Sequence, residues 1–158
     1  MTTTPPQLSL THVVDAPRAG VYRAFTDPDQ FAAWWGPFGN TLPRDEVEFD
    51  LRAGGSLQWA EYFPDRPGTW TRGRIDLTEV VEDEALDGIM RITGELPGGW
   101  APFETRMRIE FHDEPDGRTR LEIFQWLPDT HVAPTRGGWG EALTKLEAVL
   151  SAGAPGRG

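Results

Sequence analysis

The sequence has no cysteine, and basic residues are scarce: Lys and Arg number 15 against 25 Asp and Glu, a net charge of −10. The lack of cysteine excludes a disulfide scaffold, a thiol nucleophile and any cysteine-ligated zinc or iron–sulfur site. Because an acidic chain repels the phosphate backbone, we expect no nucleic-acid partner. With 158 residues, the chain is long enough for one domain with a substantial core.

Long hydrophobic runs are also missing. No stretch approaches the ~20 apolar residues that span a bilayer, and the first residues lack the features of a signal peptide. We therefore expect a cytoplasmic protein without a membrane span. We also expect either a monomer or a homodimer. Residues 1–7 and 151–158 lack periodicity and predict flexible tails around one domain at residues 8–150.

Motifs for several kinds of chemistry are absent. The chain has neither a dinucleotide-binding GxGxxG nor a phosphate-binding GxxxxGK[ST]. His12, His112 and His131 are far apart and match no zinc-binding spacing, so we predict no metal and no cofactor. The only lysine, Lys145, is expected on the exposed face of a helix, paired with Glu141 four residues earlier.

Local patterns predict an α+β protein. Residues 8–15 alternate as a strand, and two short helices follow at about 17–26 and 28–35. After Pro128 the pattern becomes that of a long amphipathic helix, which is the only element able to cover a one-faced antiparallel sheet. Between them, turn residues separate six further predicted strands: 46–51, 56–63, 71–81, 85–94, 104–112 and 119–126.

Three segments of the chain match a more specific family pattern. Residues 11–37 read THVVDAPRAGVYRAFTDPDQFAAWWGP, LRAGG follows at 51–55, and Gly138-Trp139 opens the apolar part of the last helix. This sequence pattern resembles that of the family of homologues of the activator of the heat-shock-protein-90 ATPase, in the START-like (SRPBCC) superfamily. The resemblance implies a helix-grip fold: a curved seven-stranded antiparallel sheet around a long C-terminal helix, with two short helices between strands 1 and 2.

The chain departs from that family pattern in three places. Glu82-Asp83 stands where the family usually has two prolines, and residues 97–103 (PGGWAPF) are unusually rich in aromatic residues, proline and glycine. Glu61 stands where the family commonly has an apolar residue. Because this fold serves many activities, membership implies the fold better than the function.

Alternation along the strands assigns the side chains that face the last helix. Most are apolar, but His12, Glu61 and Gln125 share the inward phase. A buried polar group without a partner costs about 1 to 3 kcal/mol, so each needs a partner, an opening to water or a ligand. Each could also lie at a strand end near the rim of the sheet.

Aromatic side chains supply the rest of a predicted pocket. The chain has seven tryptophans, more than a small core usually needs, although any one aromatic residue could simply belong to the core. We expect these ligand-binding residues: Trp35, Trp59, Glu61, Trp100, Phe103, Gln125, Trp139 and His12.

The main functional hypothesis is a binding protein for a small hydrophobic ligand, aromatic or polycyclic, held between the sheet and the C-terminal helix. An alternative is a cyclase, dehydratase or hydrolase in which Glu61 is the catalytic acid or base. A second alternative, implied only by the family resemblance, is a co-chaperone-like interaction module.

Overall fold

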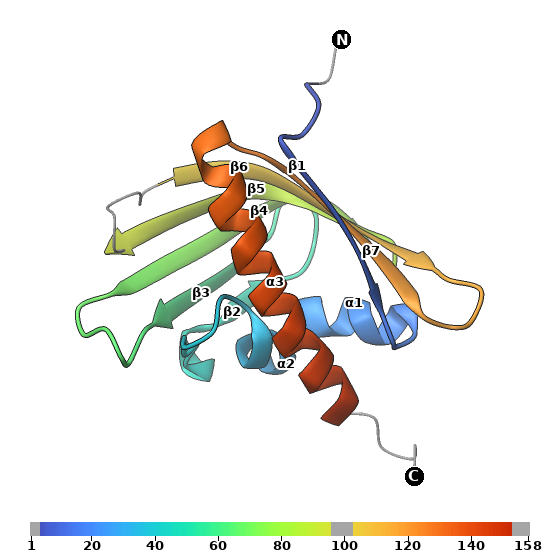
Figure 1. Ribbon diagram of the computed structural model, residues 1–158, viewed down its shortest axis with the longest axis horizontal. Coiled ribbons are helices and arrows are strands. Elements are labelled where there is room, and N and C mark those ends of the chain that lie inside the picture. Colours follow the sequence, from blue (N-terminus) through green and yellow to red (C-terminus); the bar gives the residue numbers. More distant parts are fainter. Residues whose placement is uncertain (1–3, 96–102, 153–158) are drawn as a thin grey trace.

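Seven strands form one antiparallel sheet in the computed structural model, which describes residues 4–95 and 103–152 (Figure 1). The order is β1-β7-β6-β5-β4-β3-β2, so each strand pairs with its neighbour in sequence except β1, which pairs with β7. This confirms the predicted fold class. The strands are β1 (Leu8–Val14), β2 (Glu48–Asp50), β3 (Ser56–Tyr62), β4 (Trp70–Val81), β5 (Ala85–Glu95), β6 (Phe103–Asp113) and β7 (Thr119–Trp126).

Two short helices connect β1 to β2, as the sequence predicts: α1 (Arg18–Thr26) and α2 (Pro28–Trp34). Asp27 starts α2 because its carboxylate accepts a hydrogen bond from the Asp29 backbone N–H at 2.9 Å. The strand predicted at 46–51 is shorter than expected, because a 3-10 turn, η1 (Arg44–Glu46), precedes β2.

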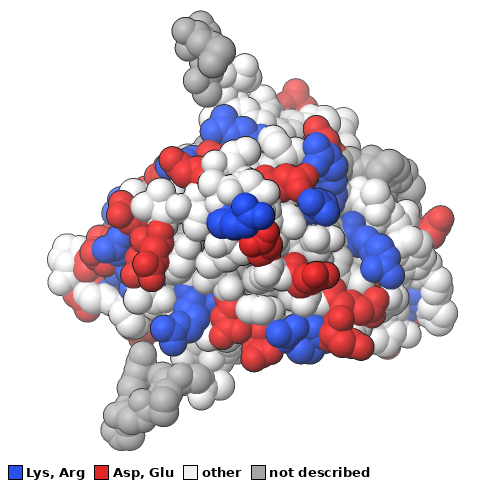
Figure 2. Space-filling model, turned by 180° about the vertical axis from the view of Figure 1, so that it is seen from behind, with Lys and Arg blue, Asp and Glu red and all other residues white. Residues whose placement is uncertain are grey.

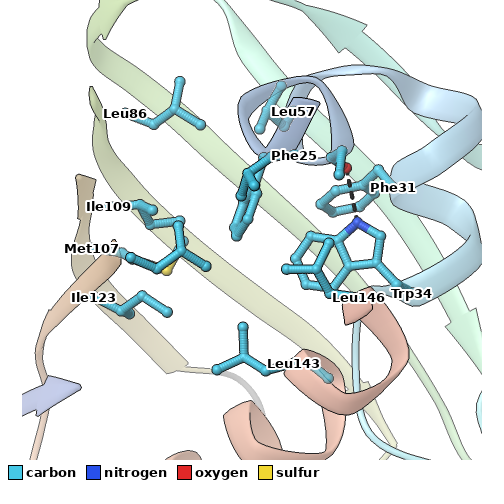
Figure 3. Close-up of a cluster of buried hydrophobic side chains, with 14 of the residues drawn as sticks. Phe25, Phe31, Trp34, Leu57, Leu86, Met107, Ile109, Ile123, Leu143 and Leu146 are labelled. Atoms are coloured by element: carbon cyan, nitrogen blue, oxygen red, sulfur yellow. Dashed lines mark hydrogen bonds between the residues drawn. The ribbon is translucent and has the colours of Figure 1, made fainter. Parts of the chain in front are cut away.

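The long helix α3 (Asp129–Ala152) crosses the concave face of the sheet, with α1 and α2 packed near its C-terminal half (Figure 1). Figure 3 shows the resulting core, in which Leu143 and Leu146 of α3 point toward side chains from the sheet and the two short helices. Leu146 is fully buried. The Trp34 indole N–H donates to the Ala24 carbonyl at 2.8 Å, which satisfies its only polar group within the core.

Strand alternation is confirmed on both faces. Most of the side chains predicted to face α3 are buried, and Leu10, His12 and Ile92 are half-buried. Arg106, Arg108 and Glu110 lie on the convex face, where acidic and basic side chains are interspersed (Figure 2). The protein therefore has one apolar, concave face and one face covered by ion pairs.

The ends of the described chain are attached to the fold. Residues 4 and 7, which belong to the predicted N-terminal tail, make hydrogen bonds to the end of β7: the Trp126 indole N–H donates to the Thr4 carbonyl, and the Leu127 backbone N–H donates to Gln7 Oε1. At the other end, α3 continues to Ala152, two residues beyond the predicted domain boundary. Within the described residues, no helix has the length and apolar character needed to cross a membrane.

Candidate functional site

An open cavity of about 410 Å³ lies between the concave face of the sheet and α3. One wall of the cavity is formed by strands β3, β4, β5 and β7. The opposite wall is formed by the N-terminal half of α3 and the loop after α2. Most of the lining is apolar. The lining residues are Trp35, Gly36, Pro37, Trp59, Glu61, Phe63, Thr71, Met90, Ile92, Gln125, Pro134, Thr135, Gly137, Gly138, Trp139, Glu141 and Ala142.

Three of the predicted tryptophans meet in the wall of this cavity. The Trp35 ring lies edge-on to Trp59, with centroids 5.3 Å apart, and edge-on to Trp139 at 5.5 Å. Trp35 also stacks on Phe31 at 4.7 Å. Trp35 thus joins the sheet wall to the helix wall, and its own position is supported by the core beneath it.

Small residues leave the space that the cavity occupies. Gly137 and Gly138 of α3 line the cavity, and a Cβ at either position would meet nothing within 4 Å. On the sheet, a Cβ at Gly73 would overlap the Trp59 ring, so the missing side chain lets that indole lie against β4. The absence of side chains at these glycines therefore determines part of the shape of the cavity.

Glu61 lies in the cavity wall on β3, with only 8% of its surface exposed. Its Oε1 accepts a hydrogen bond from the Thr71 hydroxyl at 2.9 Å, and its Oε2 accepts one from Asn40 Nδ2 at 2.5 Å. Gly36 passes close by with a positive φ of 90°, and a Cβ there would overlap Oε2. The carboxyl group is thus held in one orientation, with neutral donors as its direct partners.

The surroundings of Glu61 favour its protonated form. Burial raises the pKa of Glu61 above its ordinary value of 4.5, because desolvation penalises the charge. The hydrogen bonds from Asn40 and Thr71, and the positive charge of Lys145, lower the pKa but do not outweigh burial. Glu61 therefore takes up a proton more readily than an exposed glutamate does.

Lys145 lies elsewhere than predicted. It is half-buried and makes no ion pair with Glu141: its ammonium donates to Asn40 Oδ1 at 2.7 Å and to the Pro37 carbonyl at 3.1 Å. Glu141 instead accepts a hydrogen bond from the Phe38 backbone N–H. The exposed-pair prediction is therefore wrong, because the loop after α2 packs over this face of α3. Burial also lowers the pKa of Lys145.

Gln125 of β7 lines the cavity and is 1% exposed. The Trp139 indole N–H donates to Gln125 Oε1 at 2.6 Å, which joins the sheet to α3. Its Nε2 is buried and has no hydrogen-bond partner among the described residues. An unpaired buried donor costs about 1 to 3 kcal/mol, so this atom needs a further partner to be satisfied.

The structure does not bring every predicted residue to the cavity. His12 faces α3 but lies outside the cavity lining: its ring bonds to the Glu147 carboxylate at 2.7 Å, near the end of the helix. Strand phase predicted the face correctly but not the position along it. Trp100 lies outside the described residues. Phe103 begins β6, and its backbone pairs with Ile92 in the strand register. The structure does not describe its side chain.

Three residues around Glu61 were not predicted. Thr71 has the same inward phase as Gly73 and Ile75, so alternation contains a signal for it. Asn40 lies in a loop without periodicity, and its amide donates both to Glu61 and to the Trp35 carbonyl. Neither its role nor that of Lys145 has a signature in the sequence.

One cluster of possible metal ligands occurs on the convex face. Ligand atoms of Glu110, His112 and Glu122 lie within 4.8 Å of one another. Arg108 bonds to Glu110 at 2.7 Å and Arg120 to Glu122 at 3.1 Å, so arginines already neutralise both carboxylates. We assign this cluster to the ion pairs of the outer face.

Comparison with solved structures finds the same fold in other proteins. Protein CV1439 from Chromobacterium violaceum matches with a TM-score of 0.75 and 26% identity, covering 90% of this chain and 95% of that one. A protein from Arthrobacter aurescens matches with a TM-score of 0.73 and 24% identity, over 92% and 86% of the two chains. DynU16, a protein of the dynemicin biosynthetic locus, matches with a TM-score of 0.68 and 20% identity, over 94% of this chain and 48% of its own.

A search of curated proteins found no match. The sequence profile of the family described as "Activator of Hsp90 ATPase homolog 1-like protein" matches residues 15–151, which is nearly all of the fold. The two short helices, the seven-stranded sheet and the long C-terminal helix agree with the helix-grip architecture expected of that family. The chain therefore belongs to the Activator of Hsp90 ATPase homolog 1-like family, within the START-like superfamily.

Proposed function

We propose that the protein binds a small hydrophobic molecule, aromatic or polycyclic, in the cavity between the sheet and α3. The supporting observation is the cavity itself: its volume of about 410 Å³ is within the range of small-molecule sites, and its lining is mainly apolar with a few polar groups. Trp35, Trp59 and Trp139 offer flat surfaces against which rings can pack.

A pair of substitutions on one strand tests this proposal. Ile92 of β5 lines the cavity, whereas Ile89 of the same strand is also half-buried but lies on the convex face. Ile92→Trp should fill the cavity, and Ile89→Trp should leave it open. The measurement is native mass spectrometry of the full chain purified from its own host without detergent, followed by extraction of any retained molecule.

The expected result is a hydrophobic molecule retained by wild type and by Ile89→Trp but lost from Ile92→Trp. Urea unfolding of both variants checks that each one folds. Equal retention by all three proteins would show that the molecule binds elsewhere, and no retained molecule in any of them would count against the proposal.

An enzyme is the second candidate, and the state of Glu61 favours it. A buried carboxyl with a raised pKa, oriented by Asn40 and Thr71 in a cavity wall, has the properties of a general acid or base. Lys145 holds Asn40 from the other side, so the orientation of Glu61 depends on α3 as well as on β3 and β4.

The molecules bound by wild type and by Glu61→Gln distinguish catalysis from binding. An enzyme should retain product in the wild type and accumulate substrate in the variant, so the two extracted masses would differ by the atoms gained or lost in the reaction. A pure binding protein should yield the same mass from both proteins.

The family description supports a third candidate, a co-chaperone-like module. Such a module should stimulate the ATPase activity of Hsp90, and the stimulation should be the same for Ile92→Trp as for wild type. Failure to stimulate would remove this candidate.

A further inference from the structure

The orientation of the Gln125 amide follows from its neighbour. An indole N–H can only donate, so the atom that faces Trp139 Nε1 at 2.6 Å must be the amide oxygen. The amide nitrogen, with two N–H donors, is then the atom left without a partner. Gln125 lines the cavity, and a buried, fixed donor on a lining residue is complementary to an acceptor on the ligand.

The charges around the cavity constrain the ligand further. Among the described lining residues, the charged ones are Glu61 and Glu141, and no basic residue is present. The nearest ammonium, that of Lys145, is occupied by Asn40 and the Pro37 carbonyl. An anionic ligand would find no cation among these lining residues to offset the loss of its hydration, which is unfavourable in an apolar site.

We propose that the ligand is an uncharged aromatic molecule with a carbonyl oxygen, and that this oxygen accepts a hydrogen bond from Gln125 Nε2. This inference rests on the proposed function and adds the ligand's chemical class and orientation. Gln125 lies on β7 and Glu61 on β3, with three strands between them. The carbonyl therefore lies at the β7 side of the cavity, away from Glu61.

Three biphenyl probes of similar size test the class: 4-acetylbiphenyl has the carbonyl, 4-isopropylbiphenyl lacks an acceptor, and biphenyl-4-carboxylate is an anion. Their affinities for the full chain are measured by titration calorimetry at pH 7. We expect the ketone to bind about tenfold more tightly than the hydrocarbon, because it satisfies a buried donor. The carboxylate should bind more weakly than both.

Two variants test the role of Gln125. Gln125→Met removes the amide, and the ketone's advantage over the hydrocarbon should disappear. Gln125→Leu also removes the amide and should abolish the advantage too, so the test still holds if Gln125→Met is poorly folded. Gln58→Met, at a glutamine on the convex side of β3, is the matched control and should keep the tenfold preference.

The outcomes separate this inference from the function on which it rests. Equal binding of ketone and hydrocarbon to wild type, tighter binding of the carboxylate, or a preference that survives in both Gln125 variants would overturn the carbonyl assignment while leaving the cavity as a binding site. If no probe binds, or if Ile92→Trp binds the ketone as tightly as wild type, both proposals fail.

Discussion

Each face of the sheet carries one buried carboxyl group, and the two have different partners. Asp87, on the convex face, is 6% exposed and accepts hydrogen bonds from Arg106 at 2.9 and 3.2 Å and from Arg108 at 3.1 Å. Glu61, on the concave face, is 8% exposed and has only neutral direct partners. Similar burial therefore accompanies two different electrostatic environments.

The difference separates a structural acid from one available to a ligand. Two guanidinium groups form charge-assisted hydrogen bonds to Asp87 and occupy its carboxylate oxygens. Glu61 has no such counter-charge in contact, so burial raises its pKa and leaves its hydrogen-bonding capacity facing a cavity. Gln125 also lies on the concave face, and its amide nitrogen is a buried donor without a partner among the described residues.

The largest effect is expected for Asp87→Ala. Removing this carboxylate takes from Arg106 the one carboxylate it pairs with among the described residues, whereas Arg108 keeps Glu79 and Glu110. The free energy of unfolding should fall by about 2 kcal/mol, because hydrogen bonds between charged groups are lost at a buried site. Urea denaturation measures the change. Asp76→Ala is the control on the same face, where an exposed carboxylate pairs with Arg74 and Arg91, and should cost less than about 1 kcal/mol. Equal losses would remove the distinction between buried and exposed acids.

A smaller effect is expected from the titration of Glu61. Its folded-state pKa is raised, so the folded protein holds this proton more tightly than the unfolded chain does. The resulting stabilisation is complete below the ordinary value of 4.5 and is lost as the pH rises through the raised value. The free energy of unfolding of wild type minus that of Glu61→Gln should therefore decrease with rising pH in this window, and an increase would contradict the assigned environment.

Lys145→Met should have an effect of about 1 kcal/mol, because it removes the hydrogen bonds to Asn40 and the Pro37 carbonyl from a half-buried site. It should also raise the pKa of Glu61 further, since the lysine charge lowers that pKa. A carbon-13 NMR titration of the Glu61 carboxyl measures the shift. Arg136→Met, at an exposed cation of α3, should leave this pKa unchanged.

The smallest effect is expected for His12→Ala. The pair with Glu147 is partly exposed and should contribute less than about 0.5 kcal/mol. Because His12 lies outside the cavity, the affinity for 4-acetylbiphenyl should also be unchanged. A loss of affinity above about tenfold would place His12 in the site after all.

Strand alternation explains why much of the site could be predicted. A period of two assigns each side chain to a face, so Trp59, Glu61 and Gln125 were placed on the concave side from the sequence. Alternation does not report position along that face, and His12 therefore lies beside the end of α3 instead of in the cavity.

The polar contacts of the site could not be predicted, because they join segments distant in sequence. Asn40 approaches Glu61 across 21 residues, and Lys145 approaches Asn40 across 105. A helical pattern identifies the apolar stripe of α3 but not the loop that covers its flank, so Lys145 was assigned to solvent. The hydrogen bond between Trp139 and Gln125 likewise depends on how α3 crosses the sheet.

Gly73 affects the volume of the cavity but not the polar groups that line it. The Trp59 ring occupies the place where a side chain of residue 73 would begin, and Gly73 is not itself among the lining residues. Adding one methyl group there would push the indole off β4 toward the empty space, while Glu61, Gln125 and the α3 wall kept their own contacts. A substitution at position 73 would thus change the volume of the cavity without changing the polar groups that line it.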